Sequence, residues 1–432
     1  MKMANMDDYF DVVIVGTGAA GLYCALNLPA RYRILLLTKQ KADESDSFLA
    51  QGGICMQHGE ADYRPFFDDT MRAGHYENNP ATVDLMIRSS NSIIRDLVRR
   101  GVSFARDDHG ALRFTREGAH SRPRILFHED ITGHEITQTL LNEVLRCENI
   151  ELREHTTLLD FFADASACGG VIAVGPDGEP RAIGAGAVVL ACGGIGGLYK
   201  NSTNFPHITG DAIAMALRHG VACEYLDYIQ IHPTTLYSHR KGRRFLISES
   251  VRGEGALLLD KNGNRFTNEL QPRDVVSAAI RAQMEKDGTD HVWEDMRPIG
   301  EAAIREHFPN ILERCEEEGY DPIHEPIPVV PAQHYFMGGI TADLSSRTAL
   351  PRLYACGETC CNGVHGRNRL ASNSLLESLV FAQRAADDIL YGEPPVFTGD
   401  KPDLAPYREQ EPLFAAYRQE VLTAIERSKK HE

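Results

Sequence analysis

The chain has 432 residues, 43% of them hydrophobic and 25% charged, so it is long enough for two or three domains with buried cores. Its formal net charge of -16 disfavours nucleic acid and anionic membranes as partners, because both would repel an acidic surface. No stretch approaches the roughly 18 to 20 apolar residues of a membrane span, and the N-terminus lacks the apolar centre of a signal peptide, so we expect a cytoplasmic protein.

The first predicted element is a βαβ unit that binds a dinucleotide. An apolar run at residues 11–15 leads into GTGAAG at 16–21, and a helical pattern follows to residue 28. In this fingerprint the glycines permit a tight turn, a close approach of the pyrophosphate and close packing of helix on strand. The second strand, 33–38, is followed by Lys39 rather than by the acidic residue that would hold an NAD ribose. This disfavours an NAD dehydrogenase and leaves FAD open.

The next segments alternate between helical and strand patterns. The stretches 46–53 and 187–194 are small and glycine-rich, as expected where backbone lies beneath a ligand. We expect helices at 80–100, 133–146 and 210–219, strands at 150–162, 171–174 and 187–190, and a hairpin turn at 175–178.

From about residue 225 the segments become short, polar and rich in turns. Helices are expected at 273–286 and, as an acidic pair, within 297–319, but strong buried parallel strands are absent. We therefore predict a separate, more mobile domain at 226–336, inserted into a nucleotide-binding domain made of 1–225 and 337–393. The returning part holds a strand at 353–358 and a helix at 373–390, and residues 394–432 form a tail with one amphipathic segment at 413–425.

The ten cysteines contain no CxxC pair, so the ligand spacing of zinc and iron–sulfur sites is absent and we expect no metal. Most should be reduced residues of the core. For the adjacent pair Cys360 and Cys361, a redox-sensitive dithiol is an alternative that the sequence does not exclude.

Seven motifs in this order resemble the succinate dehydrogenase, fumarate reductase and L-aspartate oxidase superfamily of flavoproteins. The motifs are GTGAAG (16–21), AQGG (50–53), QIHPT (230–234), RGEG (252–255), RDVV (273–276), HYFMGG (334–339) and RLASNSLLE (369–377). The resemblance covers residues 10 to 392 and implies an α/β fold: a Rossmann-like FAD-binding domain with an inserted α+β capping domain. Relatives generally continue into a helical C-terminal domain, which we expect to be largely missing here.

The resemblance implies a non-covalent FAD, because Asp46 stands where succinate dehydrogenases carry the histidine that bonds to the flavin. The residues that match FAD contacts of the family are Gly16, Thr17, Gly18, Ala19, Gly21, Lys39, Asp46, Ser47, Ala50, Gln51, Gly52, Gly53, Asp211, Glu358, Ser374 and Leu375.

The same resemblance implies a site for a four-carbon dicarboxylate. Arg369, assisted by His334, would bind one carboxylate, and a guanidinium fork suits that task. The residues expected to bind the rest of the substrate are Gln230, His232 and Ser248. Arg273 would act as proton donor or acceptor, with a relay through Glu249 and Arg252. A guanidinium is a poor base, so the relay carboxylate would have to help.

The loop REGAHS at 116–121 is similar to the L-aspartate oxidase version of the active-site loop, although its composition alone would indicate solvated surface. A buried Glu117 would attract the ammonium of aspartate. With succinate, which has no ammonium, the Glu117 carboxylate would face the two substrate carboxylates. This repulsion would cost on the order of a few kcal/mol of binding free energy at a separation of about 4 Å. Ser248 keeps a hydroxyl where threonine is common in the family.

We therefore expect oxidation of L-aspartate to iminoaspartate, with oxygen (giving hydrogen peroxide) or fumarate as acceptor. This would be the first step of quinolinate and NAD synthesis, with a functional link to quinolinate synthase. The alternatives are a soluble fumarate reductase or succinate dehydrogenase flavoprotein, and a catalytically idle FAD-binding protein.

Overall fold

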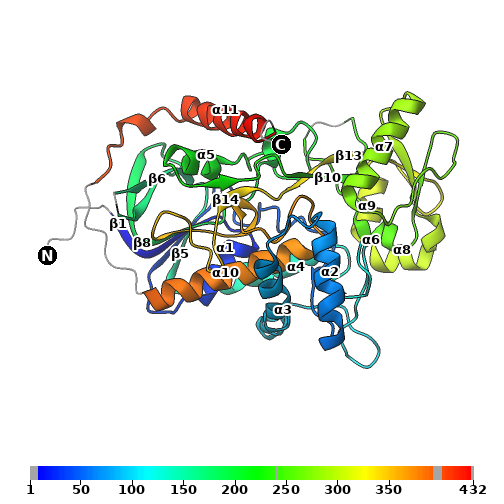
Figure 1. Cartoon of the computed structure of the whole chain (residues 1–432), viewed down its shortest axis with the longest axis horizontal. Coiled ribbons are helices and arrows are strands. Elements are labelled where there is room, and N and C mark those ends of the chain that lie inside the picture. Colours follow the sequence, from blue (N-terminus) through cyan, green and yellow to red (C-terminus); the bar gives the residue numbers. More distant parts are fainter. Residues whose placement is uncertain (1–7, 165, 240–241, 393–400, 430–432) are drawn as a thin grey trace.

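A seven-stranded sheet forms the centre of the larger part of the molecule in this computed structural model, which describes residues 8–164, 166–239, 242–392 and 401–429 (Figure 1). Its strands, in spatial order, are β5 (Ile150–Arg153), β2 (Ile34–Leu37), β1 (Asp8–Val15), β8 (Pro180–Leu190), β7 (Cys168–Val174) and β6 (Thr157–Ala163), with β15 (Leu353–Ala355) also on β8. The strands from β5 to β8 and β15 are parallel, and β7 and β6 are added antiparallel. All of β2 is buried, as expected for a parallel sheet covered on both faces.

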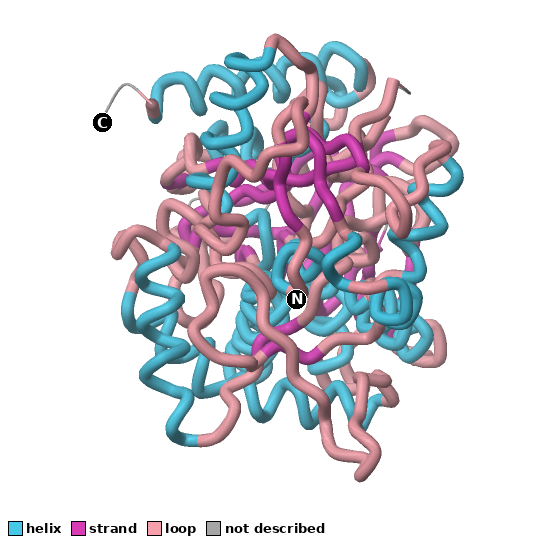
Figure 2. The backbone as a smooth tube through the Cα atoms, turned by 90° about the vertical axis from the view of Figure 1, so that its right-hand side faces the viewer, coloured by secondary structure: helices cyan, strands magenta, loops and turns pink. Residues whose placement is uncertain are grey.

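Helices cover both faces of this sheet. One face carries α1 (Ala19–Asn27), α3 (Pro80–Arg100), α4 (Thr132–Val144) and α10 (Asn373–Gly392), with α2 (Tyr63–Ala73) packed on α3. The other face carries α5 (Asp211–Arg218) and α11 (Gln410–Ser428) (Figure 1). The buried residues of α11 are Tyr417, Val421 and Ile425. Figure 2 shows the helices lying mainly outside the strands. The result is a layered α/β unit with one apolar core on each side of its sheet.

A second unit has its own sheet and core. Its antiparallel strands, in spatial order, are β10 (Ile229–Leu236), β13 (Ile327–Phe336), β12 (Val292–Asp295) and β11 (Leu257–Leu259). Its helices are α6 (Glu249–Gly253), α7 (Arg273–Asp287), α8 (Glu301–His307) and α9 (Pro309–Glu317). Val276, Ile280 and Phe308 belong to its separate apolar core. We refer to this unit, on the right of Figure 1, as the cap. Together, the layered α/β unit and the α+β cap confirm the expected fold class.

The remaining elements are short. A three-stranded sheet contains β9 (Cys223–Glu224), β14 (Gly339–Thr341) and β16 (Cys360–Cys361), and β3 (Ile54–Cys55) pairs with β4 (Ile125–Leu126). Single 3-10 turns occur at Glu60–Asp62, Gly196–Leu198, Arg297–Ile299, Gly357–Thr359 and Ala405–Tyr407. Within the described ranges, every helix is too short or too polar to span a bilayer.

The predicted helices agree with the structure, and the caps of α3 give a local reason for the bounds of that helix. Asn79 accepts a bond from the backbone N–H of Ala81 at the start of α3, and Gly101 ends that helix in the left-handed conformation. Several predicted strands differ in extent, among them the strand expected at 187–190, which begins at Pro180 as β8. The strand expected at 150–162 is broken into β5 and β6, where His155 is left-handed, and the strand expected at 353–358 ends at Ala355.

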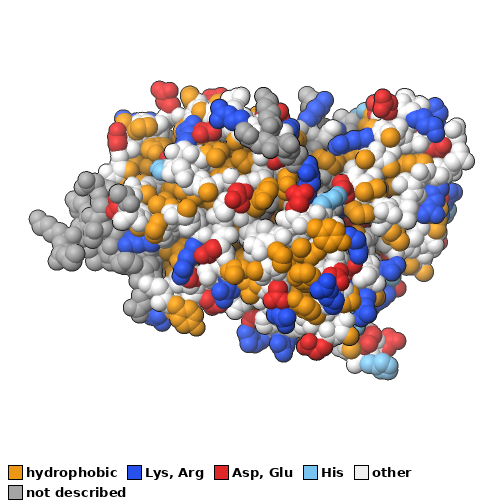
Figure 3. Space-filling model, in the orientation of Figure 1, with side chains coloured by type: hydrophobic (Ala, Val, Ile, Leu, Met, Phe, Trp, Pro, Cys, Tyr) orange, Lys and Arg blue, Asp and Glu red, His pale blue; other side chains and the backbone are white. Residues whose placement is uncertain are grey.

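The predicted tail contains α11, which is longer than the amphipathic segment expected there. Residues 394–400 and 430–432 of that tail, and residues 1–7 at the other end, lie outside the described residues. In Figure 3, acidic and basic side chains are interspersed over the face shown, so the net charge of -16 does not gather into one acidic field on this face.

Candidate functional site

A cavity of about 220 Å³ runs from the carboxyl ends of β1, β2 and β8 toward the cap. Its outer part is lined by the loops after these strands and by residues 44–53. Its inner part is lined by side chains from β10, α6, α7, β13 and the segment before α10. Ligands of open α/β sheets bind at the carboxyl edge of the strands, so this cavity is the candidate site.

The turn from β1 into α1 requires its glycines. Gly16 has φ +114°, and a Cβ there would lie 2.1 Å from the Ala191 carbonyl oxygen. A Cβ on Gly21 would lie 1.9 Å from the carbonyl oxygen of Gly16, so helix and turn touch directly. The α1 N-terminus therefore lies against the cavity, where its N–H groups suit a pyrophosphate. Thr17 and Gly18 line the cavity, whereas Ala19 bonds through its backbone N–H to Ser47 Oγ at 3.0 Å.

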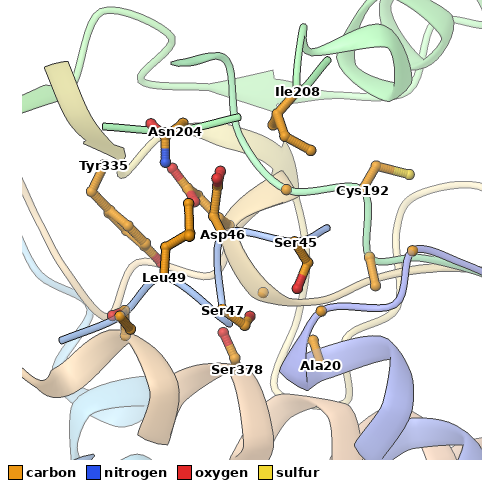
Figure 4. A pocket seen from close by; sticks show the side chains of 18 of the residues that line it. Ala20, Ser45, Asp46, Ser47, Leu49, Cys192, Asn204, Ile208, Tyr335 and Ser378 are labelled. Carbon is orange, nitrogen blue, oxygen red and sulfur yellow. The ribbon is translucent and has the colours of Figure 1, made fainter. Parts of the chain in front are cut away.

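The segment 45–53 forms part of the wall of the outer cavity (Figure 4). Three of its polar atoms are buried and have no hydrogen-bond partner among the described residues: Ser45 Oγ, Asp46 Oδ2 and Gln51 Oε1. Buried polar atoms normally have partners, so these atoms point to a polar ligand in the cavity. Together with the glycine turn, they fit the hydroxyl chain and ring edge of FAD. The predicted contacts that line the cavity here are Ser47, Ala50, Gln51, Gly52 and Gly53, with Ser374 and Leu375 opposite.

Lys39 and Asp211 meet at the outer end of the cavity. Lys39 Nζ lies 2.6 Å from Asp211 Oδ2 and 3.1 Å from the carbonyl oxygen of His207. The same ammonium lies 5.1 Å from the centre of the Phe414 ring, which belongs to α11. The C-terminal helix therefore contacts a predicted cofactor residue.

Asp46 and Glu358 are two partly buried carboxyl groups in the cavity. Burial raises the pKa of Asp46 to about 7, although the Phe205 N–H bonds its Oδ1 at 2.8 Å. Burial and the nearby Asp46 raise the pKa of Glu358 to about 8. Figure 4 shows the Asp46 side chain inside the cavity near Asn204. A carboxyl group here offers no ring nitrogen for bonding to a flavin.

Two arginines lie at the inner end, tied together by Gln230. Arg273 Nη1 donates to Gln230 Oε1 at 2.8 Å, and Gln230 Nε2 donates to the carbonyl oxygen of Arg369 at 2.8 Å. The amide also donates to Asn368 Oδ1 at 2.8 Å. Gln230 does not line the cavity, contrary to the expectation that it binds substrate directly. Its amide instead fixes the two arginines relative to each other.

Arg369 points its guanidinium into the cavity from the segment before α10. Its Nη1 donates to Ser374 Oγ at 2.7 Å, and its Cζ lies 4.2 Å from the centre of the Tyr335 ring. Burial and the neighbouring Arg273 lower its pKa to about 10, so it keeps its charge near neutral pH. Nε is buried without a partner among the described residues, which leaves a donor for an anion.

His232 and His334 lie close to the arginines, with ring centres 5.1 Å apart. Burial, reinforced by Arg273, lowers the pKa of both far below the ordinary value, so both rings are neutral. His334 Nδ1 lies 2.7 Å from Thr203 Oγ1. His232 Nδ1 lies 3.0 Å from the Thr234 carbonyl oxygen and 3.2 Å from the Thr234 backbone nitrogen, so Thr234 occupies this side of the ring and Nε2 faces the other way. Nε2 is buried without a partner in the described part of the chain, so it can bond a ligand.

Glu249 joins Arg273 to Arg252. Its Oε2 lies 2.5 Å from Arg273 Nε and 3.8 Å from Arg252 Nη2. Burial alone would raise the pKa of Glu249, but the two arginines outweigh it and hold that pKa below its ordinary value. Arg252 does not line the cavity and donates through Nη1 to the Glu269 carbonyl oxygen at 2.7 Å. Ser248 caps α6 and lines the cavity beside this pair.

Glu117 lies in the cavity wall and is 3% exposed, whereas Arg116 and Ser121 of the same loop are exposed. Ser250 Oγ donates to its Oε1 at 2.8 Å, and Ser372 Oγ donates to its Oε2 at 2.5 Å. Burial and the Glu249 carboxylate raise the pKa of Glu117, and the two hydroxyls oppose this. Sequence reasoning missed Ser250 and Ser372, although both lie within or beside motifs that it used.

A buried network holds the loop that carries Glu117. Arg124 is fully buried and bonds Asp62 at 3.0 Å, Asp69 at 2.8 Å and His120 Nδ1 at 2.8 Å. Burial lowers the pKa of His120 to about 4, and its Nε2 lies 3.0 Å from the carbonyl oxygen of Ala371. The neutral ring thus accepts from Arg124 and donates to the segment that carries Ser372.

The described residues contain no group of three or more His, Cys, Asp or Glu side chains that could hold a metal ion. Cys360 and Cys361 are free thiols, both buried. Burial raises the pKa of Cys361 to about 12, which disfavours the thiolate that redox exchange needs.

Comparison with known proteins places this cavity in a family. Residues 11–375 match the model of the FAD binding domain family. The chain is 48% identical to a Clostridium perfringens L-aspartate oxidase over 380 residues, covering 88% of this chain and 86% of that protein. It is 44% identical to a Nostoc L-aspartate oxidase, covering 98% of this chain and 76% of that protein. A solved E. coli quinol fumarate reductase is similar at 31% identity with a TM-score of 0.84, covering 94% of this chain and 74% of that one.

Proposed function

The chain belongs to the L-aspartate oxidase family of FAD-binding flavoproteins, and from this premise we propose that it oxidises L-aspartate to iminoaspartate. FAD supplies the hydride acceptor when it is bound along the outer and middle cavity. The substrate would occupy the inner end, where Arg273, Arg369 and two neutral histidines converge. The single observation that carries the choice of substrate is the buried Glu117 carboxylate, which lines the same cavity as Arg273 and Arg369.

The inner cavity offers one anion site at each side of the substrate. Arg369, through its unpaired Nε, would hold one carboxylate, with His334 beside it. His232 Nε2 and the Ser248 hydroxyl would hold the other. Because both ends of the four-carbon chain are fixed, its reacting carbon is oriented without further contacts.

Glu117 would hold the third charged group of aspartate, its ammonium. A carboxylate with two donated hydrogen bonds keeps further acceptor capacity, so it can receive an N–H from the substrate. Succinate has no cation to place there and would leave a buried negative charge facing its own carboxylates. This favours aspartate over succinate.

Arg273 and Glu249 would handle the proton that leaves the substrate. The contact of 2.5 Å between Arg273 Nε and Glu249 Oε2 is short and buried. When Arg273 accepts a proton from the substrate, it can therefore pass its own Nε proton to the Glu249 carboxylate. Arg252 Nη2 lies 3.8 Å from the same carboxylate oxygen, Glu249 Oε2. Arg252 is thus proposed to act behind the pair rather than on substrate.

We propose oxygen, with hydrogen peroxide as product, or fumarate as the final electron acceptor. We further propose that the reaction is the first step of NAD (quinolinate) biosynthesis in the cytoplasm, with a functional link to quinolinate synthase. The proposed division of the chain is an FAD-binding domain at 1–225 and 337–393, a capping domain at 226–336 and a tail at 394–432.

Anaerobic mixing of the FAD-loaded protein with L-aspartate and, separately, with succinate tests this function. We expect L-aspartate to bleach the FAD absorbance and succinate to act far more slowly. Bleaching by succinate alone would replace the proposal with a fumarate reductase or succinate dehydrogenase, and bleaching by neither would support an idle FAD-binding protein.

A further inference from the structure

The Glu117 carboxylate is held by two hydroxyls that come from different parts of the molecule. Ser250 is the second residue of α6, in the cap, and donates to Oε1 at 2.8 Å. Ser372 lies just before α10, in the larger unit, and donates to Oε2 at 2.5 Å. Each carboxylate oxygen thus has its own donor, and the carboxylate bridges the cap and the larger unit.

The space around this carboxylate leaves it little room to turn. A Cβ added to Gly52 would lie 2.7 Å from Glu117 Oε1, and one added to Gly118 would lie 2.4 Å from Glu249 Oε1. Ser372 adopts a left-handed backbone conformation with φ +60°, which non-glycine residues rarely adopt. A strained residue that presents its hydroxyl to a buried carboxylate indicates a positioning task rather than packing alone.

The two serine hydroxyls also act on the protonation state of Glu117. Burial and the neighbouring Glu249 both favour the neutral form of Glu117, whereas the Ser372 hydroxyl, the Arg273 guanidinium and the Ser250 hydroxyl favour the anion. A neutral Glu117 would attract an ammonium far less strongly. The two serines therefore support the form of Glu117 that amine recognition needs.

We propose that Ser250 and Ser372 are positioning residues that set the preference for an amino dicarboxylate, by fixing the Glu117 carboxylate toward the substrate nitrogen. This inference rests on the proposed function and deepens it. Because one hydroxyl comes from the cap and the other from the larger unit, the amine site is complete only where these two parts meet.

Ser250→Ala and Ser372→Ala test the inference when each is assayed with L-aspartate and with succinate. We expect kcat/KM for L-aspartate to fall about 10-fold or more, as for loss of a hydrogen bond to a charged group, while kcat/KM for succinate holds or rises. The acid limb of the aspartate pH profile should move to higher pH, because Glu117 then ionises less readily. Ser250→Thr, which keeps the hydroxyl, should restore kcat/KM for L-aspartate and the position of the acid limb.

Ser92→Ala is the matched control, since Ser92 bonds only the backbone of its own helix α3 in the described contacts. FAD content, read from absorbance, should stay equal in all variants. Equal losses on both substrates, or an unchanged pH profile, would overturn the inference and leave the aspartate oxidation of the parent protein intact. If the parent protein itself oxidises no L-aspartate, both the inference and the proposed function fall.

Discussion

Arg273 Nε lies 2.5 Å from Glu249 Oε2, and this buried pair joins the start of α7 to the start of α6 at the inner end of the cavity. The same guanidinium reaches Gln230 Oε1 through Nη1 at 2.8 Å. The planar guanidinium fixes the directions of both bonds, whereas a lysine ammonium is a point charge on a flexible stem. The geometry therefore ties the position of the proposed proton-handling group to both neighbours.

Arg273→Lys should lower the rate of aspartate oxidation by on the order of 10²-fold or more, the range of a lost acid–base group. FAD content should change little, because the residue lies at the inner end of the cavity, away from the glycine turn. Steady-state kinetics and the absorbance ratio of FAD to protein measure the two effects. Arg281→Lys, on the same helix, is the control. An equal loss of FAD and turnover would refute the assigned role.

FAD should leave the protein on acid precipitation. By resemblance to succinate dehydrogenases, Asp46 stands where those proteins carry the histidine that bonds to the flavin, so no covalent bond is expected. The yellow colour should appear in the supernatant, measured by its absorbance. Colour that stays with the washed pellet would contradict the non-covalent assignment.

Glu294 should make the protein less stable as pH rises from about 5 to 8. It is fully buried on β12, and neither carboxylate oxygen has a hydrogen-bond partner among the described residues. Burial raises its pKa from 4.5 to about 8. The folded state therefore holds a proton that the unfolded chain releases between these values, and the free energy of unfolding falls as pH rises through that window.

Glu294→Gln removes that titration. The variant should gain stability relative to the parent protein between pH 5 and pH 8, in chemical denaturation at several pH values. Glu285→Gln, at an exposed position of α7, should show no such trend. A constant difference in stability across this range would contradict the assignment.

Ala119→Gly should stabilise the fold, because Ala119 has φ +64°, a conformation that costs an alanine roughly 1 to 2 kcal/mol. The greater freedom of glycine in the unfolded chain offsets about 0.4 to 1 kcal/mol of that relief. We expect a net gain of about 0.5 to 1 kcal/mol in the free energy of unfolding. Ala111→Gly, at an exposed loop position outside the left-handed set, should instead destabilise. A loss at position 119 would show that the strain is absent.

The elements that could be predicted from the sequence are those whose causes are local. The glycine turn after β1 and the capped helix α3 depend on neighbours in the chain, and both are present in the structure. The fold class also followed, because the motif order is specific in combination.

The contacts of the site could not be predicted in the same way. Glu117 meets Ser250 and Ser372, which lie 133 and 255 residues away in sequence, so only the tertiary fold brings them together. The composition of the charge run at 116–124 indicated a solvated surface. Arg124 is nevertheless fully buried, where it forms ion pairs with Asp62 and Asp69. Gln230 was expected on the substrate, but its amide contacts two arginines and Asn368 instead.

The most direct test of the central claim compares the parent protein with Glu117→Gln, mixed anaerobically with L-aspartate and with succinate. We predict that the second-order rate constant for bleaching by L-aspartate falls by about 30-fold or more, as when one partner of a buried charge pair is neutralised, while that for succinate holds or rises. An unchanged preference for L-aspartate in the variant would contradict the account, because the amine would then be recognised by some other group.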